Sequence, residues 1–301
     1  MKILYGKCFG LGNAVMSLPT IRALAEVYGP IDVLVGTGPD DFGASAIMTY
    51  LPPSVVRMVH ENYAPLVIRY DIAIMAIPFD GRWQNMVHFN AESVMDCRPR
   101  PDYSPVLGLS SWKKHEIEYQ MDNARELGYH SATPPMTFFD GTDPIDNNIV
   151  YLGMGFKRDQ HSFWSQKNWG VENFVEFIGA VKTLRPGVRF IGTGNMADLI
   201  QMGAPIMKQV GQTTLAFKGG MALQPSFKLL SGCGSYFGND TGMMHVAASM
   251  NKPTYTMMAL PGSEVKNPPW CRRNKCNMFD QFGPHPIEVA EDFAEFVWGS
   301  L

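Results

Sequence analysis

The sequence predicts an α/β protein with two Rossmann-like domains that face each other across a cleft. Short apolar runs alternate with helical segments, the alternation stops at 136–148 in a stretch dense in Asp, Gly, Pro and Asn, and it then starts again. Strands separated by helices imply right-handed crossovers and parallel sheets. The 301 residues are enough for two domains of ordinary size. We expect them to span 1–143 and 144–301.

The first half contains four predicted strands and two predicted helices. The strands are Met1–Gly6, Ile31–Gly36, Val55–Glu61 and Tyr70–Pro78. Apolar residues at helical spacing predict helices over Ala14–Gly29 and Trp112–Tyr129, each with a glycine at its end.

The second half repeats the pattern. Its predicted strands are Asn148–Gly155, Val188–Gly194, Gly234–Asp240 and Pro253–Leu260. Its predicted helices are Val171–Pro186, Ala197–Val210, Met221–Cys233, Thr241–Asn251 and His285–Leu301. We find no sequence repeat between the halves, so the two-domain prediction depends on the pattern alone.

Composition excludes several classes of protein. Hydrophobic residues make up 46% and charged residues 18%, as in a folded globular chain and unlike a disordered one. The net charge of −3 disfavours a general nucleic-acid binder. The chain opens without the pattern of a secretory signal and has no apolar run of the roughly 20 residues that cross a bilayer.

The five cysteines are odd in number and mostly scattered, which is typical of reduced thiols in the cytoplasm. Cys271 and Cys276 form the one close pair. A zinc site would need two more ligands, and only His285 is near in sequence. Free thiols are the favoured interpretation, and the alternatives are a bonded pair or a metal site.

The segment FGNDTGMMHVAASMNKP places polar residues where a strand meets a helix. In a parallel sheet, ligands bind at the carboxyl ends of strands, and the N–H groups of a helix N-terminus attract anions. Gly242 would let a ligand approach the backbone, and Thr241 could cap the helix or bind an oxyanion. Asp240 suits a sugar hydroxyl better than a phosphate. The alternative is that Asp240 and Thr241 simply cap the helix.

Two further loops carry candidate ligand groups. Gly10, Gly12 and Asn13 open the first helix without forming a dinucleotide fingerprint or a P-loop. The loop after the first strand of the second half is rich in cations and hydroxyls that could clamp a diphosphate, or could be a solvated surface. These residues are Lys157, Arg158, His161, Ser162, Ser165 and Lys167.

These segments occur in the order found in glycosyltransferase family 9, the ADP-heptose:lipopolysaccharide heptosyltransferases, and the chain resembles that family. The matching pieces are GLGNAVMSLPTIRAL, HEIEYQMDNARELGY, SQKNWGVENFVEFI and, most specifically, FGNDTGMMHVAASMNKPTYTM. The resemblance implies the two-Rossmann (GT-B) fold, with the acceptor on the first domain and the nucleotide sugar on the second.

The resemblance also implies roles for single residues. Lys167 would contact the donor phosphates, with Ser162 and Ser165 as further phosphate donors, and Asp240 would hold sugar hydroxyls. The amides of Thr241, Gly242 and Met243 would cradle the diphosphate, and His245 would reach the donor or pack beneath it. Gly194 falls in the strand-loop Val188–Asp198, near which the family binds ribose and adenine. That loop has no glutamate to match the family's usual acid.

Gly10, Gly12 and Asn13 fall on the acceptor side, where this chain departs from the family. Asn13 stands where the family has an aspartate proposed as general base, and an amide cannot take up the acceptor proton at neutral pH. We expect another carboxylate of the first half to serve, with Asp80 favoured over Asp40 and Asp41. Alternatively, the reaction proceeds with a weak base, or the protein binds a nucleotide sugar without turnover.

The resemblance implies an inverting, metal-independent transfer from a nucleotide-diphosphate sugar to a hydroxyl of a glycan or glycolipid, as in lipopolysaccharide synthesis. No cofactor is expected. The protein would be cytoplasmic, with transient contact at the inner face of the membrane. A basic run of Arg98, Arg100, Lys113 and Lys114 could meet acidic groups of the acceptor or could be a solvated face. Alternative acceptors are a protein or a modified nucleic acid, and a Rossmann oxidoreductase is the most distant alternative.

Overall fold

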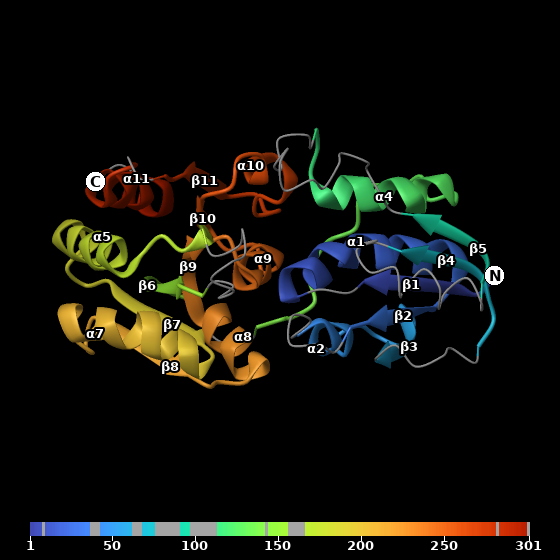
Figure 1. Cartoon of the computed structure of the whole chain (residues 1–301), viewed down its shortest axis with the longest axis horizontal. Helices are drawn as coiled ribbons and strands as arrows, with labels where there is room; N and C mark the ends of the chain where they lie inside the picture. Colours follow the sequence, from blue (N-terminus) through green and yellow to red (C-terminus); the bar gives the residue numbers. More distant parts are fainter. Residues whose placement is uncertain are drawn as a thin grey trace. The chain divides into compact units, whose positions relative to one another are not determined.

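The computed structural model describes residues 1–7, 10–36, 43–61, 68–75, 91–96, 113–141, 144–155, 166–280 and 283–299. The described residues up to Phe139 form one unit, and those from Asp140 onward form a second. Each unit consists of one sheet with helices packed on it (Figure 1). Both sheets are parallel, as predicted.

The first unit has a five-stranded sheet in the order β3-β2-β1-β4-β5. Its elements are β1 (Ile3–Lys7), α1 (Leu11–Tyr28), β2 (Ile31–Val35), α2 (Ala44–Met48), β3 (Val56–Glu61), β4 (Tyr70–Met75), β5 (Ala91–Asp96) and α4 (Glu116–Glu126). The sequence analysis missed α2, which has five residues, and β5. The run AESVMD of β5 is only partly apolar because it is an edge strand paired with β4 alone.

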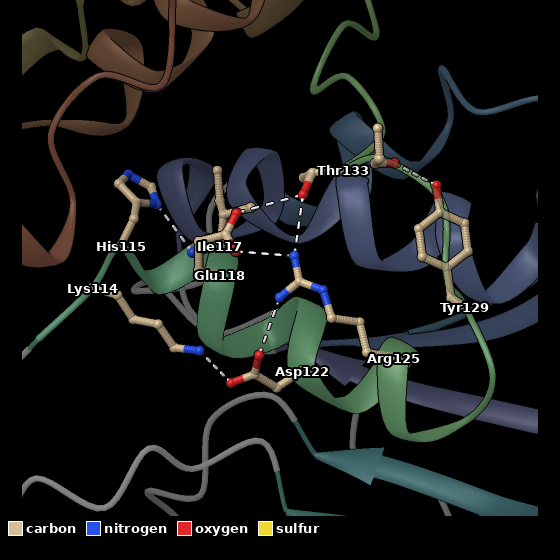
Figure 2. A network of polar contacts seen from close by, with 9 residues as sticks. Lys114, His115, Ile117, Glu118, Asp122, Arg125, Tyr129 and Thr133 are labelled. Carbon is tan, nitrogen blue, oxygen red and sulfur yellow. Dashed lines mark hydrogen bonds and ion pairs between the residues drawn. The ribbon is translucent and has the colours of Figure 1, made fainter.

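Helix α4 begins four residues after the predicted start at Trp112, because His115 caps it. The Nδ1 atom of His115 accepts the Ile117 backbone N–H at 3.0 Å. Further along, the Arg125 guanidinium donates to Glu118 at 3.0 Å and to Asp122 at 3.1 Å (Figure 2). These side chains tie together the exposed face of the helix.

A buried charge lies at the amino end of this sheet. Asp32 on β2 is 0% exposed, and its carboxylate accepts two hydrogen bonds from Arg57 at 2.9 and 2.8 Å and one from the Tyr70 hydroxyl at 2.8 Å. Burial alone would raise the pKa of Asp32, but these donors hold it below its ordinary value. Because sheet ligands bind at the opposite, carboxyl end, we assign this cluster a structural role.

The second unit has a six-stranded sheet in the order β11-β10-β9-β6-β7-β8. Its strands are β6 (Asp146–Gly153), β7 (Arg189–Gly194), β8 (Leu215–Gly219), β9 (Cys233–Asn239), β10 (Thr254–Met258) and β11 (Asn274–Met278). Its helices are α5 (Val171–Leu184), α6 (Met196–Asp198), η3 (Leu199–Gly203), α7 (Ala204–Val210), α8 (Leu223–Gly232), α9 (Gly242–Ser249), α10 (Ser263–Lys266) and α11 (Pro286–Trp298).

Helices α5 and α11 pack side by side over an aromatic core of the second unit (Figure 1). The rings of Phe177 and Phe237 stack with centroids 3.7 Å apart, and Phe293 meets both edge-on at 5.4 Å. All three side chains are 0% exposed. Burying a phenylalanine contributes about 1.5–3 kcal/mol, so this cluster fixes α5 against β9.

One prediction for this unit was wrong in detail, and three elements were missed. The single helix expected over Ala197–Val210 is interrupted by the π-helical turn η3, because Pro205 at the start of α7 has no backbone N–H to continue the α-helical ladder. The short helix α10 and the strands β8 and β11 were not predicted. Both strands lie at the ends of the sheet, where pairing on one side alone leaves a mixed polar sequence.

Candidate functional site

The order of strands in the second unit defines a topological switch point between β6 and β9. After β6 the chain passes to β7 and β8 on one side, and after β9 it passes to β10 and β11 on the other. In parallel α/β sheets the crevice for a ligand opens at the carboxyl ends of the two strands that flank this point. Here those ends are Gly153 and Asn239.

Glycines make the close approach of these two strands feasible. Gly153 pairs with Gly238, and a Cβ atom on Gly238 would lie 2.3 Å from the Gly153 carbonyl oxygen. A Cβ atom on Gly153 would lie 1.8 Å from the Tyr236 hydroxyl. That hydroxyl donates to the Asn239 carbonyl at 3.1 Å and lies 3.3 Å from Thr241 Oγ1. Tyr236 therefore supports the turn that follows β9.

Asn239 joins the two halves of the site. It is 0% exposed, and its Nδ2 donates to the carbonyls of Met154 and Gly155, both at 3.4 Å. Its Oδ1 accepts the backbone N–H of Trp169 at 3.3 Å. The Trp169 ring packs into the aromatic core, 5.5 Å from the ring of Phe237. This anchor fixes the segment just before α5.

Lys167, two residues before that anchor, forms an ion pair with Asp240 at the end of β9. The side chains are 14% and 4% exposed, so the pair is largely removed from water. Asn267, which follows α10, donates from Nδ2 to Asp240 Oδ1 at 3.0 Å. The sequence analysis selected Lys167 and Asp240 but missed Asn267, because no motif marks it.

The neighbours of Asp240 keep it ionised. Burial alone would raise the pKa of this carboxyl, but the Lys167 ammonium, with smaller contributions from His245 and Lys266, holds the pKa below its ordinary value. Asp240 therefore carries a negative charge at neutral pH and acts only as a hydrogen-bond acceptor. His245 is 3% exposed and lies one turn into α9.

The N-terminus of α9 adjoins this carboxylate. Thr241 is the N-cap residue in an extended conformation, yet its side chain makes no capping hydrogen bond. Asp240 is engaged by Lys167 and Asn267. Neither side chain therefore serves as a helix cap, and the partly exposed Gly242 and Met243 begin the helix. Such an N-terminus is a general anion site.

A second carboxylate lies at the adjoining strand end. Gly194 closes β7, and a Cβ atom there would lie 2.7 Å from Asp198. Asp198 and Asn195 form a capping box: the Asn195 N–H donates to Asp198 at 2.9 Å, and the Asp198 N–H donates back at 2.9 Å. The Asp198 oxygens lie 3.9 Å from where a Cβ atom of Gly155 would be, so this acid sits beside the loop after β6. The sequence analysis did not select Asp198, although the N-x-x-D spacing of this capping box could have indicated it.

The acceptor-side residues lie at the start of α1 in the first unit. Gly10 is the N-cap residue with φ 72°, a conformation that favours glycine, and Gly12 and the partly exposed Asn13 are in the first turn. The favoured general base, Asp80, lies outside the described residues. So do Asp40, Asp41, Lys157, Arg158, His161, Ser162, Ser165, Arg98 and Arg100.

In the predicted basic run, Lys113 is exposed, whereas Lys114 forms an ion pair with Asp122 (Figure 2). The ammonium of Lys114 also lies 4.7 Å from the centre of the Tyr119 ring. Lys114 thus has intramolecular partners on α4.

Within the described parts of the chain, Cys233, Cys271 and Cys276 are free thiols. No three His, Cys, Asp or Glu side chains there gather into a group that could hold a metal ion. None of the helices described is both long and apolar enough to cross a membrane.

A family model matches the second half of the chain. The model of glycosyltransferase family 9 (heptosyltransferase) matches residues 159–295, which include the candidate site of the second unit. This confirms the resemblance found in the sequence. None of the curated proteins compared with the chain matches it.

Solved structures share the fold over almost the whole chain. The E. coli heptosyltransferase WaaC with ADP has a TM-score of 0.72 at 17% identity, covering 98% of this chain and 99% of that one. E. coli ADP-heptose lps heptosyltransferase II has a TM-score of 0.70 at 18% identity, with 99% and 98% covered. The iron-containing dodecameric glycosyltransferase TibC from enterotoxigenic E. coli H10407 has a TM-score of 0.55 at 14% identity, with 94% and 64% covered. The two parallel-sheet units therefore correspond to the fold of heptosyltransferases, as predicted.

Proposed function

We propose that this chain, a glycosyltransferase whose residues 159–295 match the model of glycosyltransferase family 9, transfers a sugar from a nucleotide-diphosphate donor to an acceptor hydroxyl, with inversion and without a metal ion. The donor binds at the switch point of the second unit. The acceptor binds to the first unit, 1–143, and the donor unit spans 144–301.

The observation that carries this proposal is the buried pair of Lys167 and Asp240 beside the N-terminus of α9. The amides of Thr241, Gly242 and Met243 hold the diphosphate, because a helix N-terminus presents donors and positive potential to an anion. Lys167 offsets the negative charge that grows on the diphosphate as it leaves. Asp240, which can only accept hydrogen bonds, holds sugar hydroxyls.

In the transfer step the acceptor oxygen forms a bond to the anomeric carbon while the bond from that carbon to the diphosphate oxygen breaks. The acceptor proton passes to a carboxylate of the first unit, since Asn13 cannot take it at neutral pH. We assign this role to Asp80. An Asp80→Asn change lowers turnover about 10²- to 10⁴-fold if Asp80 is the base. Unchanged turnover would remove Asp80 from this role.

The donor nucleotide is the part of the proposal that binding measurements test first. Asp198 lies beside Gly194 and the loop after β6, and we assign the ribose to this place. Because one solved neighbour contains ADP and another ADP-2-deoxy-2-fluoro heptose, ADP and ADP-heptose are the first ligands to try. Thermal shift over a panel of nucleoside diphosphates, followed by calorimetric titration, identifies the base. If no nucleoside diphosphate or ADP-heptose binds, the proposal fails.

Activity with chelator tests the absence of a metal. Full turnover in EDTA is the expected result. A metal analysis of the purified protein is expected to find no bound metal. Loss of turnover in EDTA would contradict it, and the iron-containing TibC makes iron the first metal to measure.

Turnover also separates the transferase from a binding protein. The alternative of nucleotide-sugar binding without reaction is motivated by Asn13, and it predicts tight donor binding with neither transfer nor donor hydrolysis.

For the acceptor we propose a glycan or glycolipid of lipopolysaccharide type, reached by transient contact at the inner membrane face. A protein or nucleic-acid acceptor would be revealed by transfer of radiolabelled sugar to that class. We propose a reducing cytoplasmic location because the five cysteines are odd in number and mostly scattered.

A further inference from the structure

One buried acceptor atom near Asp240 has no hydrogen-bond partner among the described residues. Asn267 is 6% exposed and follows α10, where its backbone N–H donates to the Ser263 carbonyl at 2.9 Å. Its side-chain Nδ2 donates to Asp240 at 3.0 Å. Its Oδ1 is buried and accepts no hydrogen bond from any residue that the structure describes. Buried polar atoms are nearly always hydrogen-bonded, so this exception requires an explanation.

The charge on Asp240 fixes which way the Asn267 amide points. Because the pKa of Asp240 is lowered, its carboxylate is ionised and can only accept hydrogen bonds. The amino group of Asn267 must therefore face Asp240, and the amide carbonyl must face away. A rotated amide would set two acceptor oxygens against each other. The vacant lone pairs of Oδ1 are thus a consequence of the charge next to them.

The missing partner must be a hydrogen-bond donor. A metal ion is disfavoured because the Lys167 ammonium already occupies the other oxygen of Asp240 and would repel a second cation. A neutral hydroxyl group has no such conflict. It can donate a hydrogen bond to Asn267 Oδ1. A neighbouring hydroxyl can donate one to the carboxylate, whose oxygens have further lone pairs.

We propose that Asn267 is a specificity-determining residue for the transferred sugar, whose carbonyl accepts a hydrogen bond from one sugar hydroxyl while Asp240 accepts one from a neighbouring hydroxyl. This inference rests on the proposed function, and it adds to that function the requirement for a donor sugar with two free hydroxyls at this place. A site built to bind a hydroxyl rejects an analogue that lacks it, because the protein acceptor is then left buried and unpaired.

The test compares ADP-heptose with ADP by calorimetric titration in the full-length protein. Asn267→Ala is expected to weaken ADP-heptose binding about 10- to 100-fold, the loss of one buried hydrogen bond, and to change ADP binding less than about 2-fold. Asn277→Ala is the matched control, since its Nδ2 donates to the Tyr255 hydroxyl at 3.0 Å and not to Asp240. This control is expected to bind both ligands as the unchanged protein does.

Deoxyfluoro analogues of ADP-heptose identify the hydroxyl. For one position, the analogue should bind the unchanged protein more weakly than ADP-heptose, whereas Asn267→Ala should bind the two equally. Equal losses of ADP and ADP-heptose in Asn267→Ala, or the same loss for every analogue in both proteins, would mean that Asn267 only supports the fold. That result overturns the inference.

Folding is checked by the circular-dichroism melt of each variant. If Asn267→Ala does not fold, Asn267→Leu, which is close to asparagine in volume and has no acceptor, replaces it in the same comparison. The two levels of the proposal fail differently. Absence of ADP and ADP-heptose binding by the unchanged protein refutes the proposed function, and the inference with it. If Asn267→Ala prefers ADP-heptose over ADP as strongly as the unchanged protein does, only the role of Asn267 is refuted and the proposed function stands.

Discussion

Replacing Lys167 by methionine tests whether its ion pair with Asp240 organises the site. Methionine keeps the apolar stem of the side chain and removes the ammonium. The Asp240 carboxylate is 4% exposed, so it would remain buried without its main counter-charge. Removing one partner of a buried pair costs about 3–5 kcal/mol. For a unit of this size that lowers the melting temperature by roughly 6–20 °C.

The pH dependence of this loss has a definite sign. In the unchanged protein the pKa of Asp240 is lowered, so its contribution to stability is present above the ordinary pKa and is lost as pH falls through the folded value. In Lys167→Met, burial dominates and raises the pKa of Asp240, so the penalty grows as pH rises above the ordinary value near 3.9. The two proteins should therefore differ more at pH 8 than at pH 5.

Scanning calorimetry at both pH values measures the effect. Lys275→Met is the control, because Lys275 is 44% exposed and pairs with Asp292 at the surface, where such a pair contributes about 0–1 kcal/mol. The double change Lys167→Met and Asp240→Asn removes the buried charge and should restore most of the melting temperature. The reasoning is wrong if Lys167→Met melts no lower than Lys275→Met. It is also wrong if the loss of melting temperature in Lys167→Met, relative to the unchanged protein, is the same at pH 5 and at pH 8.

Two further predictions concern the glycine contact and the thiols of the second unit. Gly238→Ala should destabilise the protein by about 1–3 kcal/mol, because its Cβ would lie 2.3 Å from the Gly153 carbonyl oxygen. As a control, Gly179→Ala in α5, where a Cβ would meet no atom of the described residues outside its own helix within 4 Å, should stabilise the protein by about 0.5–1 kcal/mol. Equal melting temperatures for the two variants would contradict the close contact at Gly238. Burial, with Asp240 nearby, raises the pKa of Cys276 to about 12, so iodoacetamide at pH 8 should label it far more slowly in the native than in the urea-unfolded protein. Rapid native labelling, measured by mass spectrometry, would show that the pKa of this half-buried thiol is not raised.

The fold class and most elements followed from the sequence because their causes are local. Strand-to-helix alternation depends on periodicity within a few residues, which is why both parallel sheets and the helices α1, α4, α5, α9 and α11 were predicted. The strands β8 and β11 were missed because an edge strand is paired on one side alone, so their short runs LAFKG and NKCNM are only partly buried and mix polar with apolar residues.

The sequence by itself also selected Lys167 and Asp240, through a glycine-rich strand-to-helix junction and a cluster of donors. Only the tertiary structure decided that these residues, 73 positions apart, form one buried pair, and that Asn267 holds the second carboxylate oxygen. It also decided that Thr241 leaves its helix uncapped by a side chain. The physical reason is that strand order brings β6 and β9 together at the switch point, and burial there sets the charge of Asp240; neither is encoded in any short segment of the chain.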